Sequence, residues 1–206
     1  MTKTDPHAAS VKHLSRDKRL GAFIRSYGPI KHRRPRVGGA FQSLAESIIY
    51  QQLSGKAAGT ILGRFVALYK GKKFPTPGEV LSTPTPKLRS AGLSGQKAAY
   101  LEDLAAKFKD GTIEPRRFNR MTDEEIIEHV TAVKGIGEWT AHMFLMFTLA
   151  RPDVLPTGDL GIQKGFQKLF KLRAKPSPEK MLKLAKIWAG HRTVASMYLW
   201  RMLDGE

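Results

Sequence analysis

The sequence contains no cysteine among its 206 residues. This absence excludes disulfide bonds, thiolate nucleophiles, cysteine-ligated zinc and iron–sulfur clusters. The six histidines show no HExxH or comparable metal-ligand spacing. The longest apolar run, at 143–150, is too short to span a bilayer, and the N-terminal residues lack the apolar core of a secretory signal. We therefore expect an intracellular protein (cytoplasm or nucleoid, or nucleus in a eukaryote) with no membrane association.

Acidic residues are also scarce, with 18 Asp and Glu against 35 Lys and Arg, for a net charge of +17. This excess favours a polyanionic partner, because neutralising phosphates releases counterions. The alternative is a protein that is merely basic and soluble. Residues 1–40 carry ten basic and two acidic side chains, including the basic run at 31–36, which either touches DNA or forms an exposed loop. Residues 111–150 are instead slightly acidic.

No stretch alternates apolar and polar residues in the pattern of a strand, so we predict an all-α protein. Thr122 opens a capping box with Glu125, and Ser94 is a predicted helix N-cap. Four prolines between 75 and 86 predict short turns. The apolar periodicity predicts helices at about 11–27, 41–49, 61–68, 95–108, 123–132, 138–150, 160–171, 178–188 and 190–203.

Two glycines, Gly135 and Gly137, separate two helical segments within residues 127–147. So short a link needs glycine, because a Cβ obstructs the backbone conformation of the turn. The bare backbone also lets the amides of Lys134-Gly135-Ile136-Gly137, and the start of the following helix, approach a phosphate. This pattern predicts a helix-hairpin-helix DNA-binding motif, whose amides grip DNA without local positive charge. The alternative is an ordinary αα-corner with a glycine turn.

Asp159 is the candidate catalytic residue. It follows Pro156-Thr-Gly and precedes an amphipathic helix, so it is expected to be the N-cap, where the helix dipole favours its ionised form. A fixed carboxylate can stabilise positive charge that develops on a sugar during cleavage of an N-glycosidic bond. The alternative is a helix cap with no other role.

Three motifs in this order resemble the helix-hairpin-helix DNA glycosylases, and most closely their 3-methyladenine DNA glycosylase II branch. The motifs are SLAESIIYQQLSGKAA at 43–58, AGLSGQKAAYLEDLA at 91–105 and VTAVKGIGEWTAHMFLMFTLARPDVLPTGDLGIQKGFQKLF at 130–170. The resemblance covers roughly residues 10–203, and we expect a compact form without the additional β domain of larger members. It implies a single helical unit with two lobes around a DNA-binding cleft. The predicted lobes are about 35–125 and 1–34 plus 126–206, with the helix-hairpin-helix at about 123–150.

The resemblance implies base flipping and excision of alkylated purines such as 3-methyladenine or 7-methylguanine from double-stranded DNA, in base excision repair, with Asp159 at the family's catalytic position. A cationic purine leaves without a general acid, and none is evident. Trp139 stands where bifunctional relatives carry the Schiff-base lysine, so we predict a monofunctional enzyme that leaves the abasic site intact. We expect a monomer that requires no cofactor.

For the base pocket, the resemblance favours Trp139 and, as a second aromatic, Trp200, which can stack on a cationic base. Met143 and Leu160 stand where some relatives have further aromatics, so this pocket is expected to be more aliphatic. Aromatic residues on helices more often belong to a core, which is the alternative for both tryptophans.

The resemblance also assigns DNA contacts outside the hairpin. The wedge that fills the gap left by the flipped base lies in Gln51-Gln52-Leu53-Ser54, with Gln52 or Leu53 as the inserted side chain. Lys164 either contacts a phosphate or belongs to a solvated helix face. The family's structural monovalent cation, by position, would be held by the backbone carbonyls of Thr131, Val133 and Ile136.

Two other functions remain open from the sequence. A non-catalytic helix-hairpin-helix module would bind DNA in the same way but release no base. A uracil or thymine mismatch glycosylase would use the same scaffold on a neutral base, which is a poorer leaving group. The spacing of Asp159 argues against the first and the QQLSGKAA motif against the second.

Overall fold

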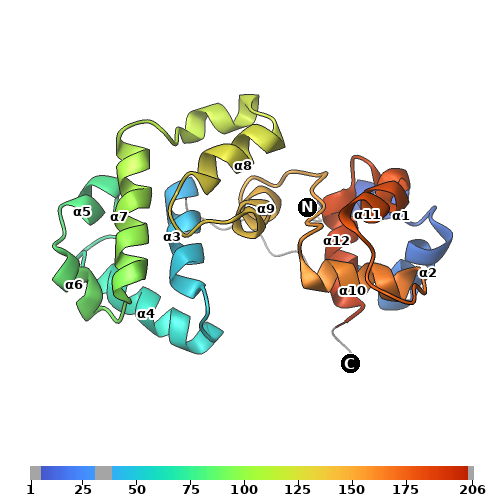
Figure 1. Cartoon of the computed structure of the whole chain (residues 1–206), viewed down its shortest axis with the longest axis horizontal. Coiled ribbons are helices and arrows are strands. Elements are labelled where there is room, and N and C mark those ends of the chain that lie inside the picture. Colours follow the sequence, from blue (N-terminus) through green and yellow to red (C-terminus); the bar gives the residue numbers. More distant parts are fainter. Residues whose placement is uncertain (1–5, 31–38, 204–206) are drawn as a thin grey trace, which may run out of the picture. The chain divides into compact units, whose positions relative to one another are not determined.

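The computed structural model describes residues 6–30 and 39–203, and every regular element in that part of the chain is helical, which confirms the predicted all-α class (Figure 1). The elements are α1 (Ala8–Leu14), α2 (Lys18–Tyr27), α3 (Ala40–Tyr50), α4 (Gly55–Ala67), α5 (Pro77–Leu81), α6 (Thr85–Ser90), α7 (Gly95–Lys109), the 3-10 helix η1 (Pro115–Arg120), α8 (Asp123–Thr131), α9 (Glu138–Phe147), α10 (Leu160–Leu169), α11 (Pro178–Leu184), the 3-10 helix η2 (Ala185–Trp188) and α12 (Arg192–Arg201). Over these same residues, no helix is long and apolar enough to cross a membrane.

The described residues form two compact units, one of residues 39–144 and one of 6–30 with 145–203. The division differs from the predicted one, because residues 126–144 belong with the first unit rather than with the C-terminal segment. The reason is that the hairpin is hydrogen-bonded to Gln51, directly after α3, and to Asp103 on α7. The basic run at 31–36 lies outside the described residues.

In the unit of residues 39–144, α7 packs against α3, α5 and α6 (Figure 1). The predicted caps are confirmed: the Ser94 side chain accepts from the Lys97 amide at the start of α7, and Thr122 and Glu125 form the capping box of α8. Each cap satisfies amides that the first helical turn leaves without a partner. The starts of α7 and α8 are therefore specified locally by their sequence.

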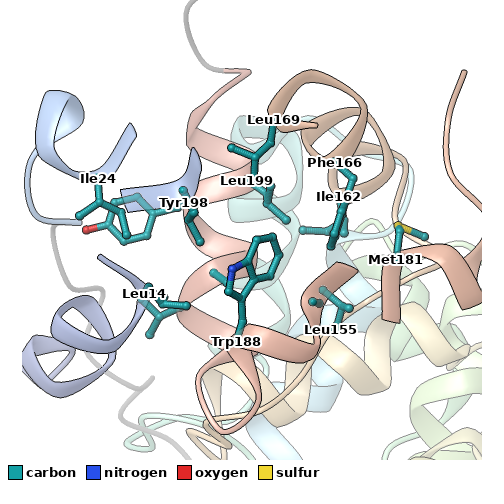
Figure 2. Close-up of a cluster of buried hydrophobic side chains, with 14 of the residues drawn as sticks. Leu14, Ile24, Leu155, Ile162, Phe166, Leu169, Met181, Trp188, Tyr198 and Leu199 are labelled. Atoms are coloured by element: carbon teal, nitrogen blue, oxygen red, sulfur yellow. The ribbon is translucent and has the colours of Figure 1, made fainter. Parts of the chain in front are cut away.

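The other unit is built around α12, which packs against α1, α2 and α10. Its core contains the fully buried Trp188 and Tyr198, enclosed by aliphatic side chains from these helices (Figure 2). Asp17 accepts hydrogen bonds from the Arg19 and Leu20 amides and, at 3.2 Å, from the Trp188 indole N–H. This core supports α10, which begins next to Asp159.

Two local predictions were wrong. The helix expected at 11–27 is divided into α1 and α2, because Asp17 caps a new helix and the chain turns before it. The proline-rich stretch contains the short helices α5 and α6 rather than turns alone. Proline fits the first turn of a helix, where its missing N–H has no partner to lose, and Thr76 adds a capping box with Glu79.

Candidate active site

Asp159 is the N-cap of α10, as the sequence predicts. Its Oδ1 atom accepts a hydrogen bond of 2.8 Å from the Ile162 amide and one of 2.9 Å from the Trp200 indole N–H. Two N–H groups and the positive end of the helix dipole thus meet the same carboxylate. The two hydrogen bonds fix the orientation of the side chain.

The segment that leads to Asp159 is held by one face of α12. Arg192 forms two hydrogen bonds with Asp153, at 2.8 and 2.5 Å. Burial alone would raise the pKa of Asp153, but the bonds from Arg192 and from nearby amides outweigh it and lower that pKa. Further along, Thr193 Oγ1 accepts from the Val154 amide at 3.0 Å. These contacts, together with the indole of Trp200, anchor both ends of the segment that leads to the candidate catalytic residue.

Gly161 makes the contact between Trp200 and Asp159 possible. A Cβ at this position would lie 2.8 Å from Trp200 Cδ1, closer than real Cβ atoms approach, and 3.0 Å from Asp159 Oδ1, which is at the tight limit of real contacts. The Trp200 ring also stacks on Phe147, with centroids 6.2 Å apart and planes 28° from parallel. The indole is therefore held on two sides, and its N–H has a defined partner rather than a solvent contact.

We expect Trp200→Phe to lower the rate constant for base release about tenfold, because a hydrogen bond to a charged group is worth about 1.5–3 kcal/mol and phenylalanine keeps the ring but loses the donor. The measurement is single-turnover excision from a methylated oligonucleotide. Phe147→Leu is the matched control, since it removes the ring stack and leaves the indole N–H in place. A wild-type rate for Trp200→Phe would show that the indole acts through ring contact alone.

The hairpin connects α8 and α9 in the unit of residues 39–144. Val133 and Ile136 are buried and the Ile136 amide donates to the Val133 carbonyl at 3.1 Å, so the apolar residues anchor the turn. Gly135 and Gly137 are exposed, and their amides donate to no other group in the described part of the chain. Exposed amides at the start of a helix form an anion-binding site. The hairpin therefore has the geometry needed to hold a phosphate.

The two hairpin positions are glycine for different structural reasons. Gly135 has φ of +81°, and a Cβ there would lie 2.1 Å from the Tyr100 ring. Gly137 has no heavy atom within 4 Å of a built Cβ. The turn itself thus requires Gly135, whereas Gly137 leaves open the space in front of the amides.

The loop before α4 contacts the hairpin directly. The Gln51 side-chain amide donates to the Gly135 carbonyl at 2.7 Å, and Ser54 caps α4 by accepting from the Ala57 amide. Gln52 has φ of +56°, a left-handed conformation that side chains other than glycine rarely adopt, and Leu53 is 38% exposed. Gln51 and Ser54 therefore have structural partners, while Gln52 and Leu53 are exposed, and their role as the wedge stays a prediction.

The predicted pocket residues differ in exposure. Trp139 and Leu160 are 55% and 51% exposed, among the most exposed large apolar side chains described, which argues against a core role. Met143 is half-buried on α9. Trp139 and Met143 belong to one unit and Leu160, Trp200 and Asp159 to the other, so their pairing in one pocket stays a prediction. Lys164 is exposed on α10, a position consistent with either of its two predicted roles.

The hairpin carbonyls fit a hard cation by their chemistry. Thr131 is the last residue of α8, where carbonyls lack helical partners, and in the described residues its carbonyl accepts from no other group. The Val133 carbonyl accepts one hydrogen bond and retains a second lone pair. No cluster of three or more acidic or imidazole side chains that could hold a metal occurs in the described residues. The backbone oxygens of Thr131 and Val133 are therefore available as ligands.

Comparison with known proteins identifies the family. A model described as the HhH-GPD superfamily base excision DNA repair protein matches residues 45–190, more than half of the chain. The protein therefore belongs to the helix-hairpin-helix superfamily of base excision DNA repair proteins, and the predicted resemblance is confirmed.

Among the relatives, DNA-3-methyladenine glycosylase 1 of Schizosaccharomyces pombe is 34% identical over 202 residues, which cover 98% of this chain and 87% of the relative. Two solved structures match as well. The 3-methyladenine DNA glycosylase of Schizosaccharomyces pombe, in complex with abasic DNA, has a TM-score of 0.80 at 34% identity and covers 94% of this chain and 95% of that one. The DNA-3-methyladenine glycosidase of Bacillus halodurans has a TM-score of 0.84 at 35% identity. The match covers 100% of this chain and 92% of that one.

Proposed function

We propose that this protein is a monofunctional DNA glycosylase that hydrolyses the N-glycosidic bond of alkylated purines, of the 3-methyladenine and 7-methylguanine type, in double-stranded DNA. The observation that carries the proposal is Asp159, held at the N-terminus of α10 by two N–H donors on one carboxylate oxygen. The names of the relatives, DNA-3-methyladenine glycosylases over nearly the full chain, support the substrate class.

The reaction follows from the charge of this carboxylate. The bond between C1′ of the sugar and the purine nitrogen breaks, and its electron pair neutralises the positive charge of the alkylated base. Positive charge then develops on the sugar, and the fixed anion of Asp159 stabilises it. Water adds to C1′ and loses a proton, which leaves an abasic site and a free base. No general acid is needed, because the cationic base is already a good leaving group.

Trp139 and Trp200 are proposed to contact the flipped base, whose positive charge is attracted to aromatic faces. The exposed Trp139 offers its ring, and Trp200 offers a ring already oriented by Asp159 and Phe147. Leu160 and Met143 supply an aliphatic wall. This combination favours alkylated purines over neutral bases such as uracil, which need polar contacts to assist departure.

We expect the purified protein to release methylated purines from methylated duplex DNA without cutting the strand, because Trp139 has no amine that could attack C1′. The experiment identifies the released bases by chromatography and, in parallel, adds borohydride to trap any imine between protein and DNA. Uracil-containing duplex is the comparison substrate. Strand cleavage with a borohydride-trapped adduct would contradict monofunctional action, and DNA binding without base release would favour the non-catalytic module.

The hairpin is proposed to hold one phosphate of the duplex through its amides, beside a monovalent cation bound by the carbonyls of Thr131, Val133 and Ile136. Such an ion supplies positive charge next to a phosphate in a segment that is itself slightly acidic. The related enzyme in complex with abasic DNA supports duplex DNA as the partner. We further propose that the protein acts as a monomer inside the cell and needs no catalytic cofactor.

A further inference from the structure

One face of α7 contacts both segments that are proposed to touch DNA. Lys97, Tyr100 and Asp103 are spaced three residues apart, so their side chains point from the same side of the helix. All three contact the loop at 51–54, the residues that precede it, or the hairpin. None of the three belongs to the catalytic position or to the predicted base pocket.

Lys97 anchors the beginning of the loop. Its ammonium donates to the Ile49 carbonyl at 2.7 Å and to the Gln51 carbonyl at 2.8 Å, where α3 ends and carbonyls lack helical partners. Lys97 is half-buried, forms no ion pair in the described residues, and burial lowers its pKa. Removing an ammonium from water without a carboxylate partner costs free energy, so stability alone does not explain this position. Its geometry instead restrains the residue directly before Gln52.

Asp103 anchors the beginning of the hairpin. Its Oδ2 atom accepts from the Lys134 amide at 2.9 Å, and Lys107 donates to the same carboxylate at 2.9 Å. Burial alone would raise the pKa of Asp103, but the bonds from Lys107 and the Lys134 amide outweigh it and lower that pKa. Between the two anchors, the Tyr100 ring fills the space next to Gly135 that a Cβ would need.

The two segments are also joined to each other. Gln51, whose carbonyl is bound by Lys97, donates its side-chain amide to the Gly135 carbonyl at 2.7 Å. Loop, hairpin and helix therefore form a closed set of contacts. A movement of the loop relative to the hairpin would break at least one hydrogen bond to a charged or buried group.

We propose that α7 positions the wedge loop and the phosphate-binding hairpin in one fixed register, with Lys97 as the positioning residue of the loop and Asp103 that of the hairpin. This inference rests on the proposed function for the identity of the two segments. A fixed register means that the hairpin, once bound to a phosphate, places Gln52 or Leu53 at a set distance along the duplex. Gap filling is then a consequence of phosphate binding rather than an independent step.

The two residues predict different defects in one binding experiment. The probe is a duplex with an abasic-site analogue opposite 2-aminopurine, whose fluorescence reports how the bases beside the gap are stacked. Lys97→Met removes two hydrogen bonds from a charged donor, a loss that shifts the loop's conformational equilibrium about a hundredfold or more. We expect the fluorescence change at saturating protein to fall below about half of the wild-type value for that reason. The dissociation constant should change much less.

Asp103→Ala should give the opposite result. The Lys134 amide loses its acceptor, so the dissociation constant rises about tenfold while the fluorescence change at saturation stays near the wild-type value. Lys97→Arg and Asp103→Asn keep a donor and an acceptor in place and should restore most of each property. Lys109→Met is the matched control, because Lys109 is an exposed lysine at the end of the same helix.

Three outcomes overturn the proposal: an unchanged fluorescence amplitude for Lys97→Met, an unchanged dissociation constant for Asp103→Ala, or the same defect in both. Thermal unfolding of each variant identifies a purely structural role, which would lower stability and leave both binding properties intact. Base release tests the proposed function separately. If the protein releases no base but the variants show the two defects, the glycosylase function is refuted and the positioning role is kept. If the protein releases base but the variants show neither defect, the positioning role is refuted and the glycosylase function is kept.

Discussion

Asp159→Asn is expected to lower the rate of base release from methylated duplex DNA about 100- to 1,000-fold, the range found when one group that stabilises transition-state charge is removed. Asparagine is an equally good N-cap, and its side-chain oxygen can still accept from the Ile162 amide and the Trp200 indole. The substitution therefore removes the charge and keeps the local structure. Single-turnover kinetics with saturating enzyme measure the chemical step.

The chain offers a matched control for this substitution. Asp17 is also a helix N-cap whose carboxylate accepts from two amides and from a tryptophan, Trp188. Asp17→Asn thus removes a carboxylate charge at a half-buried helix N-cap outside the candidate active site. We expect a wild-type rate of base release. The loss of thermal stability should be larger than in Asp159→Asn, because the amides bond Oδ1 of Asp17 and the Trp188 indole bonds Oδ2, so that asparagine loses one of the two acceptor atoms. Full activity of Asp159→Asn would refute the catalytic role of Asp159.

Gly135→Ala is expected to lower the affinity for duplex DNA about 100-fold, because several amide–phosphate hydrogen bonds depend on the hairpin backbone. Alanine pays about 1–2 kcal/mol for the left-handed conformation. Its Cβ also overlaps the Tyr100 ring, so the hairpin has to move. The dissociation constant for a duplex with an abasic-site analogue measures the effect on binding, and thermal unfolding measures the effect on stability.

Gly71→Ala separates strain from displacement of the hairpin. Gly71 has φ of +77° in the same unit, and a Cβ there meets no heavy atom within 4 Å. This variant should lose about 1–2 kcal/mol of stability for its backbone conformation, with unchanged DNA affinity. If Gly135→Ala bound DNA as tightly as Gly71→Ala, the hairpin would not be the phosphate-binding element.

Local patterns explain which features could be predicted from the sequence. Ser94, Thr122 and Asp159 were identified as helix caps because a cap involves residues at most four positions apart. The same locality misled the prediction at 11–27, where apolar periodicity continues across the turn that Asp17 introduces. Lys97 and Asp103 were missed, although both lie in the motif at 91–105 and share a helix face. The three-residue spacing of Lys97, Tyr100 and Asp103 was the signal in the sequence that could have identified them.

The sequence by itself determined that this protein has a glycine hairpin between two helices and a capping aspartate some twenty residues later. Both depend on backbone conformations that only a few residue types adopt. Tertiary structure decided the partners. Asp159 meets Trp200 across 41 residues, the Lys134 amide meets Asp103 across 31, and Gly135 meets Gln51 across 84. The physical reason is that such contacts depend on how whole helices pack, and packing follows from the shape of the assembled core rather than from any short stretch of chain.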